Sequence, residues 1–343
     1  MIPTFLRILA AIAIGYAVAA GGAMAQARTE VPIHAQTLSN GFMVFSIPVR
    51  VGKTSIEAGL DTGSTGLRIL PGVLVPGDAQ DSSQPTTGAY GSGTQISGVV
   101  ASGQVAIGGA AGPARFENIH TVGCTAGQPK CPASRIPLAQ FGMMGFGLPG
   151  AGFRAIIGIS MANAPVPNPL LELGARSWIV ELPRPGGGEA GTLILNPSDT
   201  EVNSFTLLPL VKGTFHDGVE GCLINQNTNG SACGPTLMDS GTPSISVSHS
   251  DLRAAAWGQG TPAAFSFSSD SGVTATESFS VGKTGVPSRV SIGAGGAAPA
   301  AINGGQMPYF GFDVLYLPSR NLIGVRPRSP LPGTIQATLT TGD

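Results

Sequence analysis

The stretch GLDTGSTGLRIL, residues 59–70, is the part of the sequence that decides the expected fold. It places one carboxylate, Asp61, between an apolar run and a group of small hydroxyl and glycine residues. A strand that ends in Asp presents its carboxylate at the end of a sheet, and Gly63 permits a tight turn there because it has no Cβ atom. Asp-x-Gly is also common in turns where Asp only caps the backbone, so a second feature is needed to indicate chemistry.

That second feature is LMDSGTP, residues 237–243, in the other half of the chain. Both stretches run from apolar residues to Asp, a hydroxyl residue, Gly and another hydroxyl residue. The matching positions are Asp61 and Asp239, Thr62 and Ser240, Gly63 and Gly241, and Ser64 and Thr242. If the two loops meet face to face, the carboxylates share one proton, because like charges this close cannot both ionise cheaply.

Such a pair can activate water without a metal ion or a covalent intermediate. One carboxylate deprotonates a water that attacks a peptide carbonyl, while the protonated partner polarises the carbonyl oxygen. The hydroxyl groups that follow each Asp can donate to the carboxylates, which favours their ionised form. The pattern therefore predicts a peptide hydrolase with an acidic pH optimum and no cofactor.

Composition favours an all-β fold and excludes one class of function. Charged residues make up 11% of the 343 residues, and the chain has 51 Gly and 28 Pro, which favours short strands joined by many turns. The length allows two lobes with sizeable cores. The net charge of −1, without a basic run, lacks the electrostatic footprint of a nucleic-acid-binding protein.

Hydrophobic patterning predicts several short strands and two short helices. The strands are expected at residues 42–49, 103–107, 178–182 and 192–195. The helices are expected at residues 168–173 and 250–257, the second with Ser250 as its N-cap. Low-complexity patches at residues 186–188 and 293–301 are expected to be loops.

The first 25 residues indicate export from the cytoplasm. They contain Arg7, an apolar run to about Ala20 and an Ala-x-Ala sequence that ends at Ala25, which is typical of a cleaved signal peptide. A membrane anchor is the alternative, although the apolar run is shorter than the roughly 20 residues that a span needs. We expect a periplasmic or secreted protein with no anchor after cleavage, and the short distance from Gln26 to Asp61 leaves little room for a propeptide.

Four cysteines follow the expected cleavage site, and an even number in an exported chain suggests two disulfides. The simplest of the three possible connectivities joins Cys124 to Cys131 and Cys222 to Cys233. A zinc site is the alternative, but no histidine lies beside either pair. The histidines, at positions 34, 120, 216 and 249, are scattered singly, and we expect no metal site.

Further segments give the chain a resemblance to the pepsin-like aspartic proteases. Residues 89–98, AYGSGTQISG, resemble that family's flap hairpin, and residues 105–109 resemble the strand after it. Residues 141–147 are similar to the segment that crosses behind the first Asp loop, and residues 309–316 and 321–325 to the closing strands. The resemblance runs in order from about residue 40 to residue 328.

The resemblance implies a bilobal double β-barrel or sandwich with a cleft between the lobes. Its lobes would be residues 26–200 and 201–330, followed by a tail at residues 331–343. Asp61 and Asp239 would be catalytic, Thr62 and Ser240 would bond across the lobe interface, and Ser64 and Thr242 would lie beside the carboxylates. Tyr90 and Gly91 would belong to the flap that covers an extended peptide or protein substrate, and the protein would be a monomer.

Two positions depart from the family's pattern. Arg68 stands where the family usually has a tryptophan that supports the flap tyrosine, and residues 302–305 match the second crossing segment only loosely. An alternative function is therefore a pepsin-fold protein that binds a peptide, a polysaccharide or another enzyme without useful turnover. Two motifs for other enzyme classes, G-x-G-x-x-G at residues 145–150 and a partial nucleophile elbow around Ser160, lack the flanking residues that those classes need.

Overall fold

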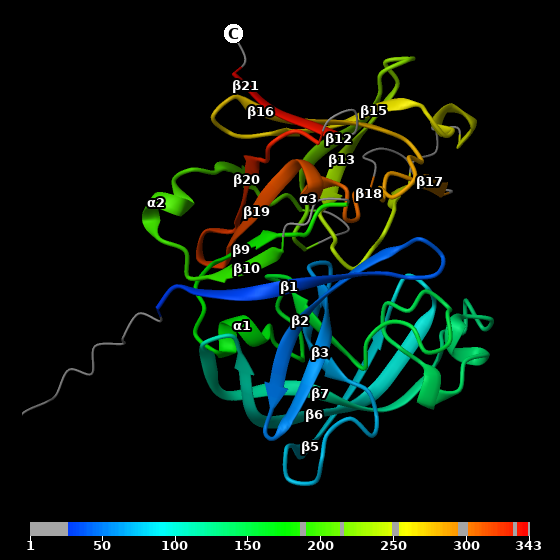
Figure 1. Cartoon of the computed structure of the whole chain (residues 1–343), viewed down its shortest axis with the longest axis vertical. Helices are drawn as coiled ribbons and strands as arrows, with labels where there is room; N and C mark the ends of the chain where they lie inside the picture. Colours follow the sequence, from blue (N-terminus) through cyan, green and yellow to red (C-terminus); the bar gives the residue numbers. More distant parts are fainter. Residues whose placement is uncertain are drawn as a thin grey trace, which may run out of the picture.

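The protein, described by a computed structural model, consists of two lobes built mainly of β-strands (Figure 1). The structure describes residues 27–185, 190–212, 216–248, 254–293, 301–331 and 335–341. The signal peptide expected at residues 1–25, His249 and Ser250 lie outside these ranges, as do residues 186–188 and most of the patch at residues 293–301. The predicted all-β, bilobal fold class is confirmed.

The larger sheet has 13 strands and extends through one lobe into the junction between the lobes. Figure 1 shows β1, β9 and β10 crossing the middle of the molecule. The spatial order of the strands is β11 (Thr206–Pro209), β20 (Leu322–Pro327), β19 (Phe312–Leu317), β9 (Trp178–Glu181), β10 (Gly191–Leu195), β1 (Thr29–Thr37), β2 (Met43–Val51), β3 (Thr54–Asp61), β8 (Ala155–Ile159), β4 (Thr65–Ile69), β7 (Ala110–Cys124), β6 (Thr94–Ile107) and β5 (Gln80–Ala89).

The second sheet has eight strands and forms the other lobe. Their spatial order is β17 (Val290–Gly293), β14 (Ile245–Ser248), β18 (Ala301–Asn303), β13 (Ser231–Leu237), β12 (Val219–Asn225), β15 (Pro262–Ser268), β16 (Val273–Ser280) and β21 (Ile335–Thr341). Strand β21 pairs with β16, so part of the segment expected as a tail belongs to this sheet. Strands β19 and β20 come from the segment expected as the second lobe, yet β19 pairs with β9 in the larger sheet.

The helices of the described residues are short. They are α1 (Pro169–Glu172), α2 (Asp199–Val202) and α3 (Pro308–Gly311), with 3₁₀ turns at Pro132–Ser134, Leu138–Gln140, Ala254–Trp257 and Pro318–Arg320. The helix expected at residues 168–173 is α1, which begins after Asn168 because the Asn168 side chain accepts a hydrogen bond from the Leu170 N–H. The helix expected at residues 250–257 is a 3₁₀ turn in its described part.

The prediction that residues 141–147 cross behind the first Asp loop is wrong. Strand β8 occupies that place, parallel to β3 and antiparallel to β4. All five residues of β8 are buried, and four of them have apolar side chains, as expected of a central strand; the fifth is Gly158. In residues 141–147, by contrast, Met144 and Phe146 have positive φ angles, which do not fit a β-strand. A Cβ atom at Gly158 would lie 2.6 Å from the carbonyl carbon of Ser64, so only glycine permits this close approach.

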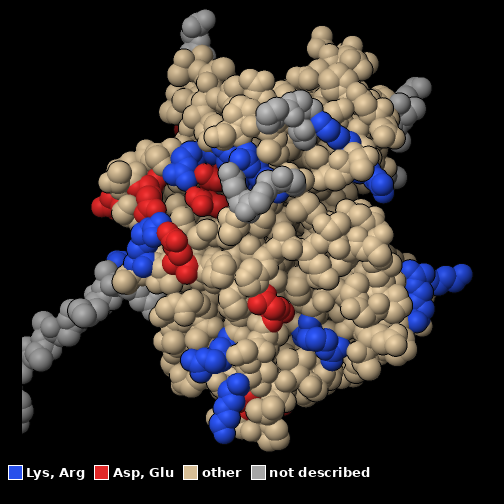
Figure 2. Space-filling view, in the orientation of Figure 1, with Lys and Arg blue, Asp and Glu red and all other residues tan. Residues whose placement is uncertain are grey.

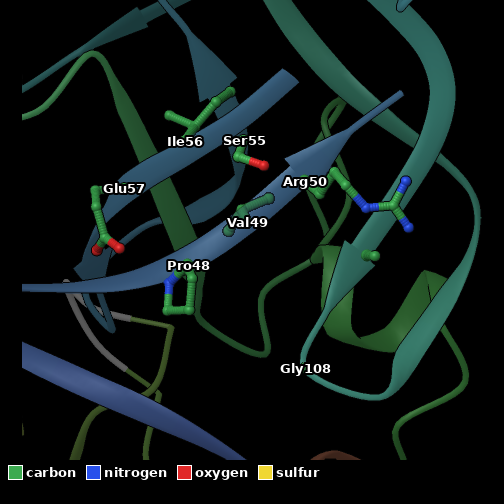
Figure 3. A pocket seen from close by; sticks show the side chains of 8 residues that line it. Pro48, Val49, Arg50, Ser55, Ile56, Glu57 and Gly108 are labelled. Atoms are coloured by element: carbon green, nitrogen blue, oxygen red, sulfur yellow. The ribbon is translucent and has the colours of Figure 1, made fainter. Parts of the chain in front are cut away.

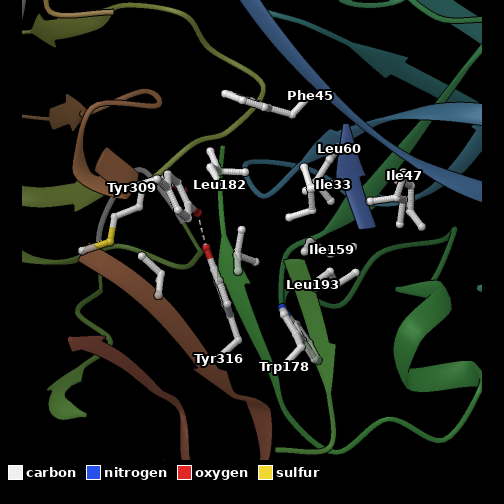
Figure 4. Packing of buried hydrophobic residues seen from close by; sticks show 14 of the residues in the cluster. Ile33, Phe45, Ile47, Leu60, Ile159, Trp178, Leu182, Leu193, Tyr309 and Tyr316 are labelled. Atoms are coloured by element: carbon white, nitrogen blue, oxygen red, sulfur yellow. Dashed lines mark hydrogen bonds between the residues drawn. The ribbon is translucent and has the colours of Figure 1, made fainter. Parts of the chain in front are cut away.

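An aromatic layer packs at the junction between the lobes (Figure 4). Trp178 of β9 stacks on Tyr316 of β19 with ring centroids 5.6 Å apart, and both side chains are fully buried. The Tyr316 hydroxyl forms a 2.6 Å hydrogen bond with the Tyr309 hydroxyl of α3, drawn as a dashed line in Figure 4. The stacking contributes about 0.5–1.5 kcal/mol to the stability of the fold beyond the effect of burying the rings. The hydrogen-bonded hydroxyl groups lie between this aromatic layer and the Asp loops.

Both expected disulfides are present. Cys124 at the end of β7 is bonded to Cys131, and Cys222 of β12 is bonded to Cys233 directly opposite on β13. Such bonds fit a protein that folds outside the reducing cytoplasm. Within the described ranges, no helix has the length and apolarity that crossing a membrane requires.

Charged side chains are sparse on the face shown in Figure 2 and gather on one side near the junction of the lobes. Arg326 of β20 bonds to Asp313 of β19 and Glu181 of β9, and Arg28 bonds to Glu201 of α2. The Arg326 pairs connect β20 to the strands β19 and β9, and the Arg28 pair connects the residue before β1 to α2. They are partly exposed, so each contributes about 1 kcal/mol or less.

Candidate active site

The two Asp loops are positioned in the same way in the two lobes. Strand β3 ends at Asp61, which lies opposite Gly158 of the parallel strand β8. Strand β13 ends two residues before Asp239, and its parallel neighbour is β18. The Asp239 N–H donates to the Gly305 carbonyl at 3.0 Å, which continues this pairing beyond the strand. Each carboxylate is therefore placed by a turn at the end of a strand that a parallel neighbour supports.

Within its loop, each carboxylate accepts the expected bond from the second hydroxyl residue and a further bond from the glycine N–H. Oδ1 of Asp61 accepts from the Gly63 N–H at 2.9 Å, and Oδ2 accepts from the Ser64 hydroxyl at 2.6 Å. The second loop repeats this geometry: Oδ1 of Asp239 accepts from Gly241 at 2.8 Å and Oδ2 from Thr242 at 2.7 Å. These bonds fix the orientation of both carboxylates.

The loops meet face to face, with each glycine against the opposite carboxylate. A Cβ atom at Gly63 would lie 2.6 Å from Cγ of Asp239, and one at Gly241 would lie 2.7 Å from Oδ1 of Asp61. Any larger residue at either position would force the carboxylates apart. Asp61 is 6% exposed and Asp239 is 7% exposed, while Gly63 is exposed and Gly241 is partly exposed, so the buried pair lies close to the surface on the glycine side.

This arrangement alters the acidity of Asp61. Burial and the neighbouring Asp239 carboxylate raise the pKa of Asp61 to about 7, although the bonds from Ser64 and Gly63 act in the opposite direction. A carboxyl group in such a place keeps its proton in mildly acidic solution. Because the two groups interact strongly, the pair loses its protons in two separate steps, and the pKa of each step depends on both carboxylates.

Thr62 and Ser240 form reciprocal hydrogen bonds between the loops. The Thr62 N–H donates to the Ser240 hydroxyl at 3.0 Å, and the Ser240 N–H donates to the Thr62 hydroxyl at 2.9 Å. Each hydroxyl also donates to the opposite strand, Thr62 to the Met238 carbonyl at 2.9 Å and Ser240 to the Leu60 carbonyl at 2.8 Å. Both side chains are fully buried, so these four bonds fix one loop against the other.

Tyr309 of α3 extends this network. Its hydroxyl donates to the Thr62 hydroxyl at 2.8 Å and pairs with the Tyr316 hydroxyl. The sequence places residues 309–316 among the expected closing strands and gives no sign that a phenol there reaches the Asp loops. The contact depends on how α3 packs against both lobes, which the sequence does not show.

Tyr90 lies in the turn of the β5–β6 hairpin. Its N–H donates to the Thr94 carbonyl at 2.9 Å and its carbonyl accepts from Gly93, while Gly91 is exposed at the tip. The Tyr90 hydroxyl is buried and has no hydrogen-bond partner among the described residues. Burial raises the pKa of Tyr90; nearby Arg68 opposes this shift, and the carboxylates Asp61 and Glu117 add to it. Asp61 is thus close enough to affect the phenol electrostatically.

Arg68 occupies the base of this hairpin in a buried ion pair. Its guanidinium bonds to Glu117 of β7, whose side chain is fully buried, and donates to the Thr65 carbonyl at 3.1 Å. Glu117 also accepts from the Thr86 hydroxyl of β5 at 2.8 Å. A Cβ atom at Gly88 of β5 would lie 3.1 Å from the guanidinium. Where a tryptophan was expected, a charged network therefore connects β4, β7 and the first strand of the hairpin.

Asn303 is a site residue that the sequence analysis missed. Its amide Nδ2 donates to Oδ2 of Asp239 at 2.7 Å. The signal was a polar residue in the segment 302–305, which matched the expected apolar pattern only loosely. Asn303 is brought to Asp239 by the pairing of β18 with β13.

Two surface hollows lie away from the two Asp loops. One of about 410 Å³ is lined by residues of β2 and β3, including Pro48, Arg50 and Glu57 (Figure 3). A second of about 470 Å³ is lined by residues such as Thr54 and Arg154. Neither hollow includes a residue of the two Asp loops, so neither contributes to the chemistry of the carboxylates. The described residues contain no cluster of side chains that could hold a metal ion.

Comparison with known proteins gave no family model that matches this chain. No curated protein matches it at a significant level either.

The first prediction concerns the bonds between the loops. Thr62→Val and Ser240→Ala should each lower the free energy of unfolding by about 1–3 kcal/mol, because each leaves a buried N–H group without an acceptor. The loss of unfolding free energy in the double variant should differ from the sum of the two single losses by more than about 0.5 kcal/mol, since the residues share one network. Urea unfolding measures both effects.

The exposed substitution Thr87→Val on β5 is the control and should change the free energy of unfolding little. If each single substitution costs less than about 0.5 kcal/mol and the two costs are additive, the loops are held together by other contacts.

The second prediction concerns the ion pair beneath the hairpin. Glu117→Leu alone leaves the Arg68 guanidinium, whose side chain is 14% exposed, without its counter-charge. It should lower the free energy of unfolding by about 3–5 kcal/mol, and the double variant Arg68→Met/Glu117→Leu should recover most of that loss. Chemical denaturation of the three proteins provides the comparison.

Arg115→Met is the matched control because it removes an exposed ion pair with Glu172. Its cost should be about 1 kcal/mol or less. A Glu117→Leu variant as stable as this control would mean that the buried pair does not hold the hairpin in place.

Proposed function

We propose that this protein is an aspartic endopeptidase of the pepsin-like kind, which hydrolyses peptide bonds with a water activated between Asp61 and Asp239. The observation that carries the proposal is the meeting of two equivalent loops, each with its glycine against the other's carboxylate. A turn-capping Asp needs neither the second loop nor the burial of both carboxylates. A shared proton needs both.

The chemistry follows from the protonation state of the pair. With one proton between them, one carboxylate can accept a proton from the attacking water while the other donates to the carbonyl oxygen of the substrate. The bonds from Ser64 and Thr242 hold the carboxylates in the orientation that this transfer needs. The pair requires no residue that forms a covalent bond to the substrate.

The proposed substrate is an extended peptide that lies over the exposed glycine side of the pair. Its backbone would form strand-like hydrogen bonds, and alternate side chains would enter pockets on either side. The β5–β6 hairpin would cover it, with Tyr90 nearest to Asp61. The unpaired Tyr90 hydroxyl supports this role, because a buried phenol without a partner is available to bond with a ligand.

We also propose that the protein acts in the periplasm or outside the cell, exported by a signal peptide at residues 1–25. The two disulfides support an oxidising location. We propose that it acts as a monomer and without a cofactor.

The third prediction follows from the pKa of Asp61. The proton of the pair is lost as the pH rises through about 7, so proteolysis of a denatured protein should have an acidic optimum and decline near that pH. Asp61→Asn and Asp239→Asn should each lower the rate by at least ~100-fold, since each removes one half of the acid–base pair. The rate is measured from roughly pH 3 to 8, which spans the expected titration of the pair.

Asp270→Asn, at an exposed turn between β15 and β16, is the control and should retain full activity. Proteolysis that survives either substitution at the pair would refute the mechanism. Absence of proteolysis at every pH, in a folded protein that still binds a statine-containing peptide, would favour a peptide-binding protein without turnover.

A further inference from the structure

The two carboxylates of the pair differ in their hydrogen-bond donors. Each accepts one backbone N–H and one hydroxyl from its own loop. Asp239 accepts a third bond, from the Asn303 amide to Oδ2, which Thr242 also reaches. Among the described residues, no side-chain amide donates to Asp61. The pair is therefore symmetric in its loops but not in its surroundings.

The difference arises at equivalent positions of the two lobes. Asn303 lies opposite Leu237, two residues before Asp239. The residue opposite Gly59, two residues before Asp61, is Ile156. Ile156 is 2% exposed and packs in an apolar cluster with residues such as Leu70 and Phe141. The second lobe thus has a hydrogen-bond donor where the first has a hydrocarbon side chain.

The orientation of the Asn303 amide is determined by its two partners. Its Oδ1 accepts from the Gly305 N–H at 2.8 Å, and its Nδ2 donates to Asp239. A flipped amide would place an oxygen against a carboxylate and an NH₂ group against an N–H, so both contacts would be repulsive. Asn303 is therefore a donor to Asp239.

The other titratable groups that face the pair lie on three elements. Tyr309 of α3 and Tyr316 of β19 interact with Asp239, and Tyr90 of the hairpin interacts with Asp61. Burial raises the pKa of all three phenols, so they remain neutral where the carboxylates titrate. The protonation of Asp61 is then set chiefly by its burial, by the other carboxylate and by its own hydrogen bonds.

We infer that Asn303 is a positioning residue that assigns the shared proton: it stabilises ionised Asp239, which becomes the base, and leaves Asp61 as the acid. This inference rests on the proposed function of the pair. An amide N–H bonds more strongly to a carboxylate than to a neutral carboxyl group, so the bond to Asn303 favours the ionised form. The raised pKa of Asp61 agrees with this assignment.

The assignment gives each proton a definite path. Asp239 accepts a proton from water as the water oxygen bonds to the carbonyl carbon, and Asp61 gives its proton to the carbonyl oxygen. In the second step the C–N bond breaks, the proton on Asp239 moves to the leaving nitrogen, and one hydroxyl of the intermediate returns its proton to Asp61. Both carboxylates end in the states in which they began.

The test is a carboxyl-carbon NMR titration of the full-length folded protein labelled at Asp, with the two signals assigned from Asp61→Asn and Asp239→Asn. In the native protein Asp239 should lose its proton first, and Asp61 should keep its proton up to a pH of about 7. In Asn303→Leu the lower titration step should rise by about one pH unit, because a bond to the ionised group is lost. The acidic limb of the kcat/KM profile should move in the same direction.

Asn118→Leu is the matched control, because it removes an amide-to-carboxylate bond, from Asn118 to Asp81, away from the pair. It should leave both titration steps unchanged. Asn303→Ser, with a side chain too short to reach Asp239, replaces Asn303→Leu if that variant does not fold, and it should raise the lower step likewise.

Earlier loss of the proton from Asp61 in the native protein would overturn the inference. So would an unchanged lower step in a folded Asn303 variant. The titration needs no substrate and no turnover, so a protein without proteolytic activity would refute the proposed function while the order of proton loss still decides the role of Asn303.

Discussion

The structure depends on the reciprocal hydrogen bonds between Thr62 and Ser240. These two side chains lie 178 residues apart in the chain and join the loops that follow β3 and β13, strands that belong to different sheets. They hold two buried carboxylates close together, where the carboxylates cannot both ionise without repelling each other. The network is fully buried and reaches through Tyr309 and Tyr316 to the aromatic layer at the junction of the lobes. The network thus connects the carboxylate pair to the packing at the junction of the lobes.

Around this symmetric centre, the two sides of the pair are built differently. On the side of Asp61, the Arg68–Glu117 ion pair supports a hairpin that carries Tyr90. On the side of Asp239, Asn303 adds a donor to the carboxylate. Two chemically similar groups can perform different roles when their surroundings favour different protonation states. The two departures from the pattern of the pepsin-like family are therefore Asn303, which would distinguish the acid from the base, and Arg68, which would fix the hairpin over the pair.

The sequence predicts the features that depend on local chemistry. The Asp loops, their hydroxyl donors, the short strands, the short helix at residues 168–173 and the disulfides between nearby cysteines all follow from residues close together in the chain. What it does not predict depends on register between distant strands: Glu117 reaches Arg68 because β7 pairs with β4, and Asn303 reaches Asp239 because β18 pairs with β13. The same reason explains why residues 141–147 were assigned the place of β8, since both segments are apolar and only strand pairing separates them.

We propose that Asp61 and Asp239 form a single site that recognises a peptide in its transition state. Calorimetric titration of the folded protein with a statine-containing peptide, whose hydroxyl group mimics the tetrahedral intermediate, tests it most directly. The account predicts binding of one peptide per chain at acidic pH, weakened strongly by Asp61→Asn and equally by Asp239→Asn, because the peptide hydroxyl would contact both carboxylates. Failure to bind the peptide, or binding that either substitution leaves unchanged, would contradict it.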